Sequence, residues 1–195
     1  IRKIYYDEKL EEHNNNKFTL LIIGGSQGAN IFDKILHESI IEISKIKTLK
    51  VIHQTNKKNI DNLKNLYSEN LIDNIVFSFD QNLNLLIQQA DLCITRAGAT
   101  SLAEISLSKK PFIAIPLPSS MDNHQLENAN YYKNKGCCWV LDQISFNKKK
   151  FEDLLLNILN NKEEIFVKKN NLEKLNYQNT WNNVNQNLLN IINEN

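Results

Sequence analysis

The chain of 195 residues has few of the residues that break or cross-link a fold, with 3 prolines, 5 glycines and 3 cysteines. Cys137 and Cys138 are adjacent and do not form an ordinary structural disulfide, and no Cys-X-X-Cys sequence occurs. A disulfide-stapled fold is therefore disfavoured. We expect reduced, buried thiols, as in a cytoplasmic protein.

The chain also lacks an excess of charge and a long apolar run. Its 23 basic and 22 acidic residues give a net charge of +1, and the basic residues form no stripe, so we expect no nucleic-acid partner. No apolar run approaches the ~20 residues of a transmembrane helix, and we expect no secretory signal. His13 and His37 lack the spacing of metal ligands and no Asp-X-Asp motif is present, so we expect neither a metal nor a cofactor.

The glycines that are present cluster after an apolar run. Gly24, Gly25 and Gly28 follow Phe18–Ile23, a run typical of a buried parallel strand, and a helical pattern begins directly after them. A helix that starts in this way presents unpaired amides and the positive end of its dipole, where anions bind. Glycines let a phosphate approach the backbone, and Ser26 adds a hydroxyl donor, so the loop is a candidate phosphate site. The alternative is a glycine-rich turn that binds nothing.

Strand and helix patterns alternate six times along the chain. We expect strands at 18–23, 49–54, 75–79, 92–95, 112–115 and 138–141. We expect helices at about 30–44, 57–67, 83–89, 98–107, 124–135 and from 147 onward. This alternation predicts an α/β fold, a Rossmann-like doubly wound parallel sheet of about six strands with C-terminal helices.

The expected organisation has three parts: a linker at 1–17, a Rossmann-like domain at 18–145 and a C-terminal helical extension at 146–195. Ligands of such sheets bind outside the carboxyl ends of the strands. The loops of unusual composition all follow strands, at 24–28, 79–82, 96–98 and 116–124. We therefore expect one binding site at the carboxyl edge of the sheet.

Two chemistries fit the glycine loop poorly. A nicotinamide-dinucleotide fold requires Gly-X-Gly-X-X-Gly and an acidic residue that closes the second strand, and both are missing here. The loop at 24–28 does match the Gly-X-Ser-X-Gly elbow of a hydrolase, with Asp91 or Asp122 and then His124 as partners. In α/β-hydrolases, however, several strands come before the elbow, whereas here it follows the first strand of the sheet.

A third chemistry, the binding of a nucleoside diphosphate, fits better. Glu104 lies one to two turns into the helix that Gly98 opens, and its carboxylate can accept hydrogen bonds from both hydroxyls of a ribose. His124, Gln125 and Asn128 carry groups of the kind that bind sugar hydroxyls. The alternatives are a solvated helix glutamate and a capped, polar helix N-terminus.

Two further polar residues are expected to be structural. Arg96 would pair with Asp91 or with helix carbonyls, and His53, in the second strand, would be a core or edge residue.

Three motifs together resemble the C-terminal half of the MurG family. They are Gly-Gly-Ser-Gln-Gly-Ala at 24–29, Thr-Arg-Ala-Gly-Ala-Thr-Ser-Leu-Ala-Glu at 95–104, and Pro-Leu-Pro at 116–118 with Asp-Asn-His-Gln-Leu-Glu-Asn-Ala at 122–129. The resemblance covers about residues 2–145. Members of that family are peripheral UDP-N-acetylglucosamine (UDP-GlcNAc) transferases that make the lipid-linked disaccharide of peptidoglycan. Their GT-B fold has two Rossmann-like domains, and the C-terminal one holds the donor.

The resemblance implies that this chain is the donor-binding half of such an inverting transferase. Arg2 resembles an arginine that closes a hinge segment, Ser26 would contact the diphosphate and Glu104 the ribose. Asp80 stands where the family usually has isoleucine, beside backbone that would pair with the uracil. The implied donor-binding set is Arg2, Gly25, Ser26, Gln27, Gly28, Asp80, Ala99, Thr100, Ser101, Leu102, Ala103, Glu104, His124 and Gln125.

The resemblance does not extend to the family's N-terminal half, which carries the acceptor site, the proposed catalytic base and an apolar patch that meets the membrane. We therefore expect this chain to bind UDP-GlcNAc without transferring it alone. The intact enzyme would meet its lipid-linked acceptor through an N-terminal domain, and would work in the cytoplasm as a peripheral protein of the inner membrane. The membrane contact would not involve this chain. The alternatives are a non-catalytic nucleotide-sugar-binding subunit with a separate N-terminal-domain partner, a serine hydrolase fragment and half of a UDP-GlcNAc epimerase.

Overall fold

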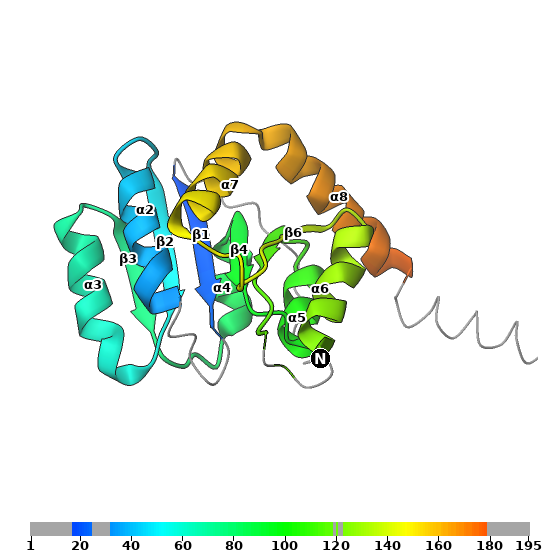
Figure 1. Cartoon of the computed structure of the whole chain (residues 1–195), viewed down its shortest axis with the longest axis horizontal. Helices are drawn as coiled ribbons and strands as arrows, with labels where there is room; N and C mark the ends of the chain where they lie inside the picture. The colour runs from blue at the N-terminus through cyan, green and yellow to red at the C-terminus, as the bar shows by residue number, and fades with distance from the viewer. Residues whose placement is uncertain (1–16, 25–31, 119, 121–122, 179–195) are drawn as a thin grey trace, which may run out of the picture.

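A computed structural model describes residues 17–24, 32–118, 120 and 123–178 of the chain. Figure 1 shows a central sheet with helices packed on both of its faces. All six strands are parallel, in the order β3-β2-β1-β4-β5-β6. Their bounds are β1 Phe18–Ile23, β2 Leu49–Gln54, β3 Asp73–Phe77, β4 Leu92–Thr95, β5 Phe112–Ala114 and β6 Cys138–Val140. The predicted doubly wound α/β fold is confirmed.

β1 lies at the centre of the sheet because its side chains are apolar on both faces. Leu20 and Ile22 pack into one core cluster, whereas Leu21 and Ile23 pack into the other. Each of the four is at most 3% exposed. Burying a side chain of this size contributes about 1.5–3 kcal/mol, so this run fixes the middle of the sheet.

The third strand begins and ends two residues earlier than predicted. β3 is an edge strand that pairs only with β2 among the described strands, and Asp73 and Ile75 are exposed. Solvent on one side weakens the apolar pattern of an edge strand, so the sequence does not mark its ends clearly. Phe79 consequently lies outside the strand and is 71% exposed.

The helices form two layers. Those of the described chain are α2 His37–Ser44, α3 Ile60–Glu69, α4 Leu83–Gln89, α5 Ala99–Leu107, α6 His124–Asn134, α7 Lys148–Asn160 and α8 Lys162–Gln178. Helices α2, α3 and α7 contribute to one core cluster, and α4, α5, α6 and α8 contribute to the other. Two short elements precede helices: the π-helical turn η1 (Phe32–Leu36) before α2 and the 3-10 turn η2 (Lys57–Asn59) before α3.

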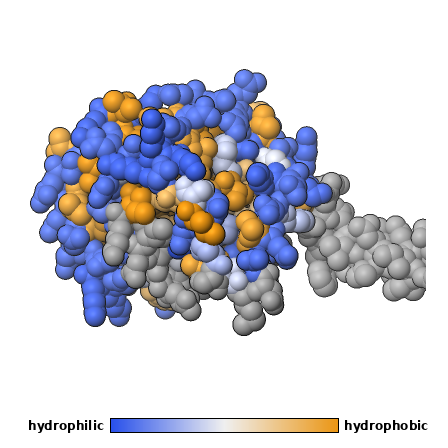
Figure 2. All heavy atoms as spheres, in the orientation of Figure 1, coloured by the Kyte–Doolittle hydropathy of each residue, from blue (hydrophilic) through white to orange (hydrophobic). Residues whose placement is uncertain are grey.

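The two edges of the sheet have different surroundings. In Figure 1 the arrow of β1 points downward, so the carboxyl edge lies along the lower side and the turn between α7 and α8 lies above the opposite edge. The face seen in Figure 2 is mostly hydrophilic, with its hydrophobic residues in small separate groups. Within the described part of the chain, no helix is both long and apolar enough to cross a bilayer.

Candidate functional site

Hydrogen bonds tie the loops after β4 and β5 together at the carboxyl edge. The amide of Arg96 donates to the carbonyl of Ile23 at 3.4 Å, which joins the ends of β4 and β1. The guanidinium of Arg96 donates to the carbonyl of Ile115 at 3.1 Å. From α6, Nδ2 of Asn128 donates to the carbonyl of Ala97 at 3.1 Å. The ends of three strands and one helix are therefore held at one place.

The N-terminus of α5 opens onto this edge. Gly98 precedes the helix with φ −67° and ψ 134°, and as a glycine it has no side chain that could cap the helix. A Cβ at Gly98 would meet nothing within 4 Å among the described residues. Ala99 and Thr100 in the first turn are exposed. An accessible helix start with a glycine at its N-cap is suited to an anion.

Glu104 lies in the second turn of the same helix and is 8% exposed. Helical side chains tilt toward the helix N-terminus, so this carboxylate lies over the turn that carries Thr100 and Ser101. Ala103 is partly exposed. Leu102 is fully buried in the core, so only its backbone is available to a ligand. Contact between Glu104 and a ribose stays a prediction.

Asp80 belongs to the turn between β3 and α4. Its Oδ1 accepts the amide of Asn82 at 2.7 Å, which closes the turn directly before the helix. One carboxylate oxygen of Asp80 is therefore engaged within the turn itself. The predicted pairing of this backbone with a uracil stays a prediction.

The start of α6 holds the loop after β5. Oε1 of Gln125 accepts the amide of Leu117 at 3.0 Å, whereas His124 beside it is exposed. The amide nitrogen of Gln125 is therefore the group that would donate to a sugar oxygen. The remaining predicted site residues lie outside the described residues: Arg2, Gly25, Ser26, Gln27 and Gly28.

A buried polar cluster that the sequence did not reveal lies at the carboxyl end of β2. Nδ1 of His53 lies 2.8 Å from the hydroxyl of Tyr67, and its Nε2 lies 3.5 Å from Oδ1 of Asp33. The other carboxylate oxygen of Asp33 accepts from Thr55 Oγ1 at 2.7 Å and from Asn59 Nδ2 at 2.8 Å. The cluster ties η1 to β2, η2 and α3. Because η1 directly follows residues 24–31, this cluster positions the helical turn next to the glycine loop.

Burial sets the charge state of this cluster. It lowers the pKa of His53, against the opposing effect of Asp33, and it raises the pKa of Tyr67. Burial alone would raise the pKa of Asp33, but interactions with His53, Thr55 and Asn59 outweigh it and lower that pKa. At neutral pH the cluster therefore holds a carboxylate beside a neutral imidazole and a neutral phenol. A histidine directly after the apolar pair Val51 and Ile52 was the only sign in the sequence.

Arg96 has a structural role, but the predicted pairing with Asp91 is wrong, and the carbonyl that it binds follows a strand instead of lying in a helix. Its guanidinium binds the carbonyl at the end of β5 and the side chain of Gln143, and it lies 4.9 Å from the ring centroid of Phe32. Asp91 precedes β4 whereas Arg96 follows it, so the length of the strand separates them. The carboxylate of Asp91 instead accepts the amide of Thr19 at 2.7 Å.

The residues that the structure describes include no group of three or more histidine, cysteine, aspartate or glutamate side chains able to hold a metal ion.

Comparison with known sequences gives a family match over most of the chain. The model of the glycosyltransferase family 28 C-terminal domain matches residues 19–183. The chain is 44% identical over 195 residues to the UDP-N-acetylglucosamine--N-acetylmuramyl-(pentapeptide) pyrophosphoryl-undecaprenol N-acetylglucosamine transferase of Pelagibacter ubique, covering 100% of this chain and 55% of that protein. A protein of the same name from Wolbachia sp. subsp. Brugia malayi is 37% identical over 179 residues, 90% of this chain and 52% of that protein. The chain spans about half the length of these curated relatives.

Solved structures show the same fold. A crystal structure of Acinetobacter baumannii MurG matches with a TM-score of 0.75 and 23% identity, over 87% of this chain and 48% of that chain. The C-terminal domain of a glycosyl transferase group 1 family protein (LpcC) from Francisella tularensis matches with a TM-score of 0.56 and 12% identity, over 83% of this chain and 85% of that chain. The described sheet and helices therefore form the C-terminal domain of a GT-B fold.

Proposed function

Because the chain belongs to the glycosyltransferase family 28 C-terminal domain family, we propose that it is the UDP-GlcNAc-binding half of an inverting N-acetylglucosaminyltransferase of peptidoglycan synthesis. The resemblance to the C-terminal half of the MurG family, predicted from three motifs, is confirmed by this match. The observation that carries the proposal is the accessible start of α5, with a glycine at its N-cap and Glu104 one turn behind it at the carboxyl edge.

In the proposed reaction, a hydroxyl of the acceptor sugar attacks the anomeric carbon of the donor. The bond from that carbon to the diphosphate breaks with inversion, and UDP leaves with the bonding electrons. Negative charge therefore grows on the diphosphate. The amides of the first turn of α5, together with the glycine loop and Ser26, would stabilise that charge, and Glu104 would hold the ribose.

The rest of the proposed enzyme lies outside this domain. An N-terminal domain would supply the catalytic base and the site for the lipid-linked acceptor. The intact enzyme would act at the cytoplasmic face of the inner membrane as a peripheral protein. This chain by itself would bind the donor and release it unchanged.

Calorimetry with UDP, UDP-GlcNAc, UDP-glucose and NAD tests the proposal. We expect UDP and UDP-GlcNAc to bind and Glu104→Gln to weaken both by at least ~1.5 kcal/mol, about tenfold, because a charge-assisted hydrogen bond becomes a neutral one. Glu69→Gln, at the exposed end of α3, is the matched control and should bind like the native chain. Equal affinities for the native chain and Glu104→Gln would refute the ribose assignment.

The structure argues against a hydrolase triad of Ser26, Asp91 and His124. Asp91 precedes β4, at the edge of the sheet opposite to the start of α6, so it cannot form a triad with His124. The other suggested partner, Asp122, lies outside the described residues. A fluorophosphonate probe that labels the native chain but not Ser26→Ala would favour a hydrolase over the proposed transferase.

A further inference from the structure

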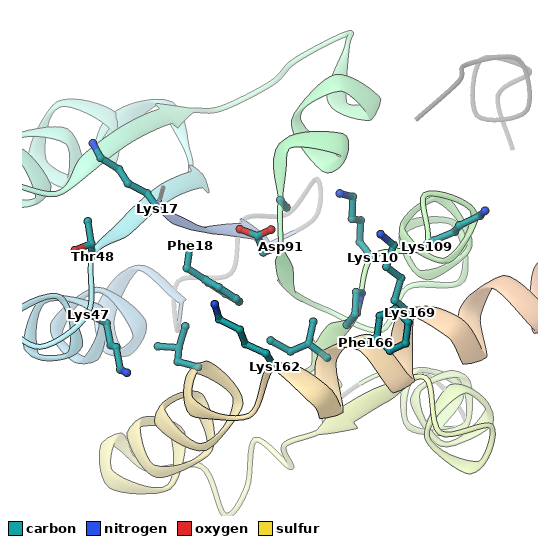
Figure 3. A pocket seen from close by; sticks show the side chains of 14 residues that line it. Lys17, Phe18, Lys47, Thr48, Asp91, Lys109, Lys110, Lys162, Phe166 and Lys169 are labelled. Atoms are coloured by element: carbon teal, nitrogen blue, oxygen red, sulfur yellow. The ribbon is translucent and has the colours of Figure 1, made fainter. Parts of the chain in front are cut away.

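A hollow of about 580 Å³ opens at the edge of the sheet opposite to the proposed donor site. The starts of β1 and β4, the turn before β5 and the turn between α7 and α8 surround it, as Figure 3 shows. The proposed donor chemistry makes no use of this hollow, since parallel strands place their carboxyl ends at the other edge.

The lining of the hollow is strongly basic. It includes the six lysines Lys17, Lys47, Lys109, Lys110, Lys162 and Lys169. Two of them turn away from the hollow in Figure 3: Lys17 pairs with Asp73 and Lys109 pairs with Glu173. The only carboxylate among the lining residues is that of Asp91, which already accepts the amide of Thr19. The lining therefore carries an excess of positive charge.

Burial of Lys110 makes its positive charge energetically unfavourable in the absence of a bound anion. Lys110 is partly buried, and its ammonium group forms no ion pair or hydrogen bond with another described residue. Burial lowers the pKa of Lys110, and the charge of Lys169 acts in the same direction, whereas Cys93 and Asp91 oppose this shift without cancelling it. In Figure 3 the side chains of these two lysines lie along the same wall, and Lys162 extends from the start of α8 toward Phe18. Lys162 likewise has no ion pair with a described residue. A bound anion would relieve the repulsion.

Between the lysines the lining is apolar. Phe18, Pro111, Leu159 and Ile165 contribute to it, and Phe166 on α8 is 61% exposed. A small inorganic anion would leave this apolar surface in water. A ligand that carries both a compact charge and an apolar part would cover it.

We propose that this hollow binds a phosphate-bearing ligand that has an apolar part. The compact, strongly hydrated ammonium groups of lysine suit phosphate, whose several charged oxygens can meet more than one lysine at once. Two sources share this chemistry, the head group of an anionic lipid and a soluble phosphorylated molecule. The experiment distinguishes them.

The test uses the whole chain at saturating UDP, so that a donor site at the carboxyl edge is filled. Cosedimentation compares vesicles of phosphatidylcholine with and without phosphatidylglycerol, and calorimetry uses phenyl phosphate, a soluble probe that has both a phosphate and an apolar part. The test variant is Lys110→Gln/Lys162→Gln. The matched control is Lys149→Gln/Lys150→Gln, which removes the same charge from exposed positions at the other end of α7.

We expect the test variant to weaken binding at least about tenfold and the control less than about twofold. Such loss of vesicle binding identifies a lipid head group, and such loss of phenyl phosphate binding identifies a soluble phosphorylated molecule. Thermal unfolding and UDP affinity, measured on the same variants, verify that the fold and the opposite edge are intact.

Three outcomes overturn the proposal: no binding of either probe, equal loss in both variants, or binding only after Asp7, Glu8, Glu11 and Glu12 are replaced by their amides. The last result would mean that carboxylates of the chain itself occupy the lysines. Failure of UDP to bind is a separate result that affects only the proposed donor function.

Discussion

At the scale of single residues, His53 is the buried group whose protonation should matter most. Burial lowers its pKa below the ordinary value of 6.5, so in acid the unfolded chain takes up a proton that the folded chain resists. Stability is therefore complete above about pH 6.5 and is lost as the pH falls from there toward the lower pKa of the folded state. We expect urea titrations between about pH 5 and 8 to show this loss, with a slope of up to about 1.4 kcal/mol per pH unit.

His53→Gln should be less stable at neutral pH, because the contacts with Tyr67 and Asp33 change, but its stability should depend less on pH across this window. His124→Gln, at an exposed position, is the control and should keep the native slope. An unchanged slope in His53→Gln would show that other groups control the acid response. Asp33 affects stability in a more acidic pH range. Its pKa is lowered from 3.8, so the stability that it contributes is lost only as the pH falls below that value.

At the scale of elements, Gly136 couples the end of α6 to α8. It adopts φ 68°, in the left-handed region, and its carbonyl accepts Nδ2 of Asn171 at 3.1 Å. A Cβ there would lie 2.8 Å from the same amide nitrogen. We expect Gly136→Ala to lower the free energy of unfolding by about 1–2 kcal/mol, from backbone strain and displacement of Asn171. Gly98→Ala, with φ −67° and open space at the Cβ, should change it by less than about 0.5 kcal/mol in chemical denaturation.

At the scale of the whole molecule, α7 and α8 belong to the same cores as the sheet. Leu172 of α8 is fully buried in the cluster that contains Cys93 and Ile105. We expect Leu172→Ala to cost about 2–5 kcal/mol and to lower the stability of the sheet as well, because one core unfolds as one unit. Val167→Ala, at an exposed position on the same helix, should cost less than about 1 kcal/mol. Separate unfolding transitions by circular dichroism and by fluorescence would show instead that the helices melt independently.

Local patterns in the chain predict the order of the elements and most of their bounds. The predicted strands at 18–23, 49–54 and 92–95 match β1, β2 and β4. In β1 and β4 the apolar residues are nearly continuous, which is a local signal of a strand buried on both faces, whereas β2 also contains Lys50, His53 and Gln54. Local patterning also located the loops of the candidate site, since a strand followed by a helix fixes which edge a loop occupies. The predicted bounds of the edge strand β3 were two residues too late, because a half-exposed strand has a weaker apolar pattern.

The contacts between polar side chains, in contrast, follow from how the elements pack. Asp33 and His53 are twenty residues apart, and no sequence pattern links them. They meet because η1 packs against the end of β2. Arg96 and Asp91 are close in the chain but lie at opposite ends of one strand. Lysines from four separate segments surround one hollow only after the sheet and α8 have packed. The physical reason is that apolar periodicity acts within one element, whereas ion pairs and hydrogen bonds between side chains depend on distances that packing alone sets.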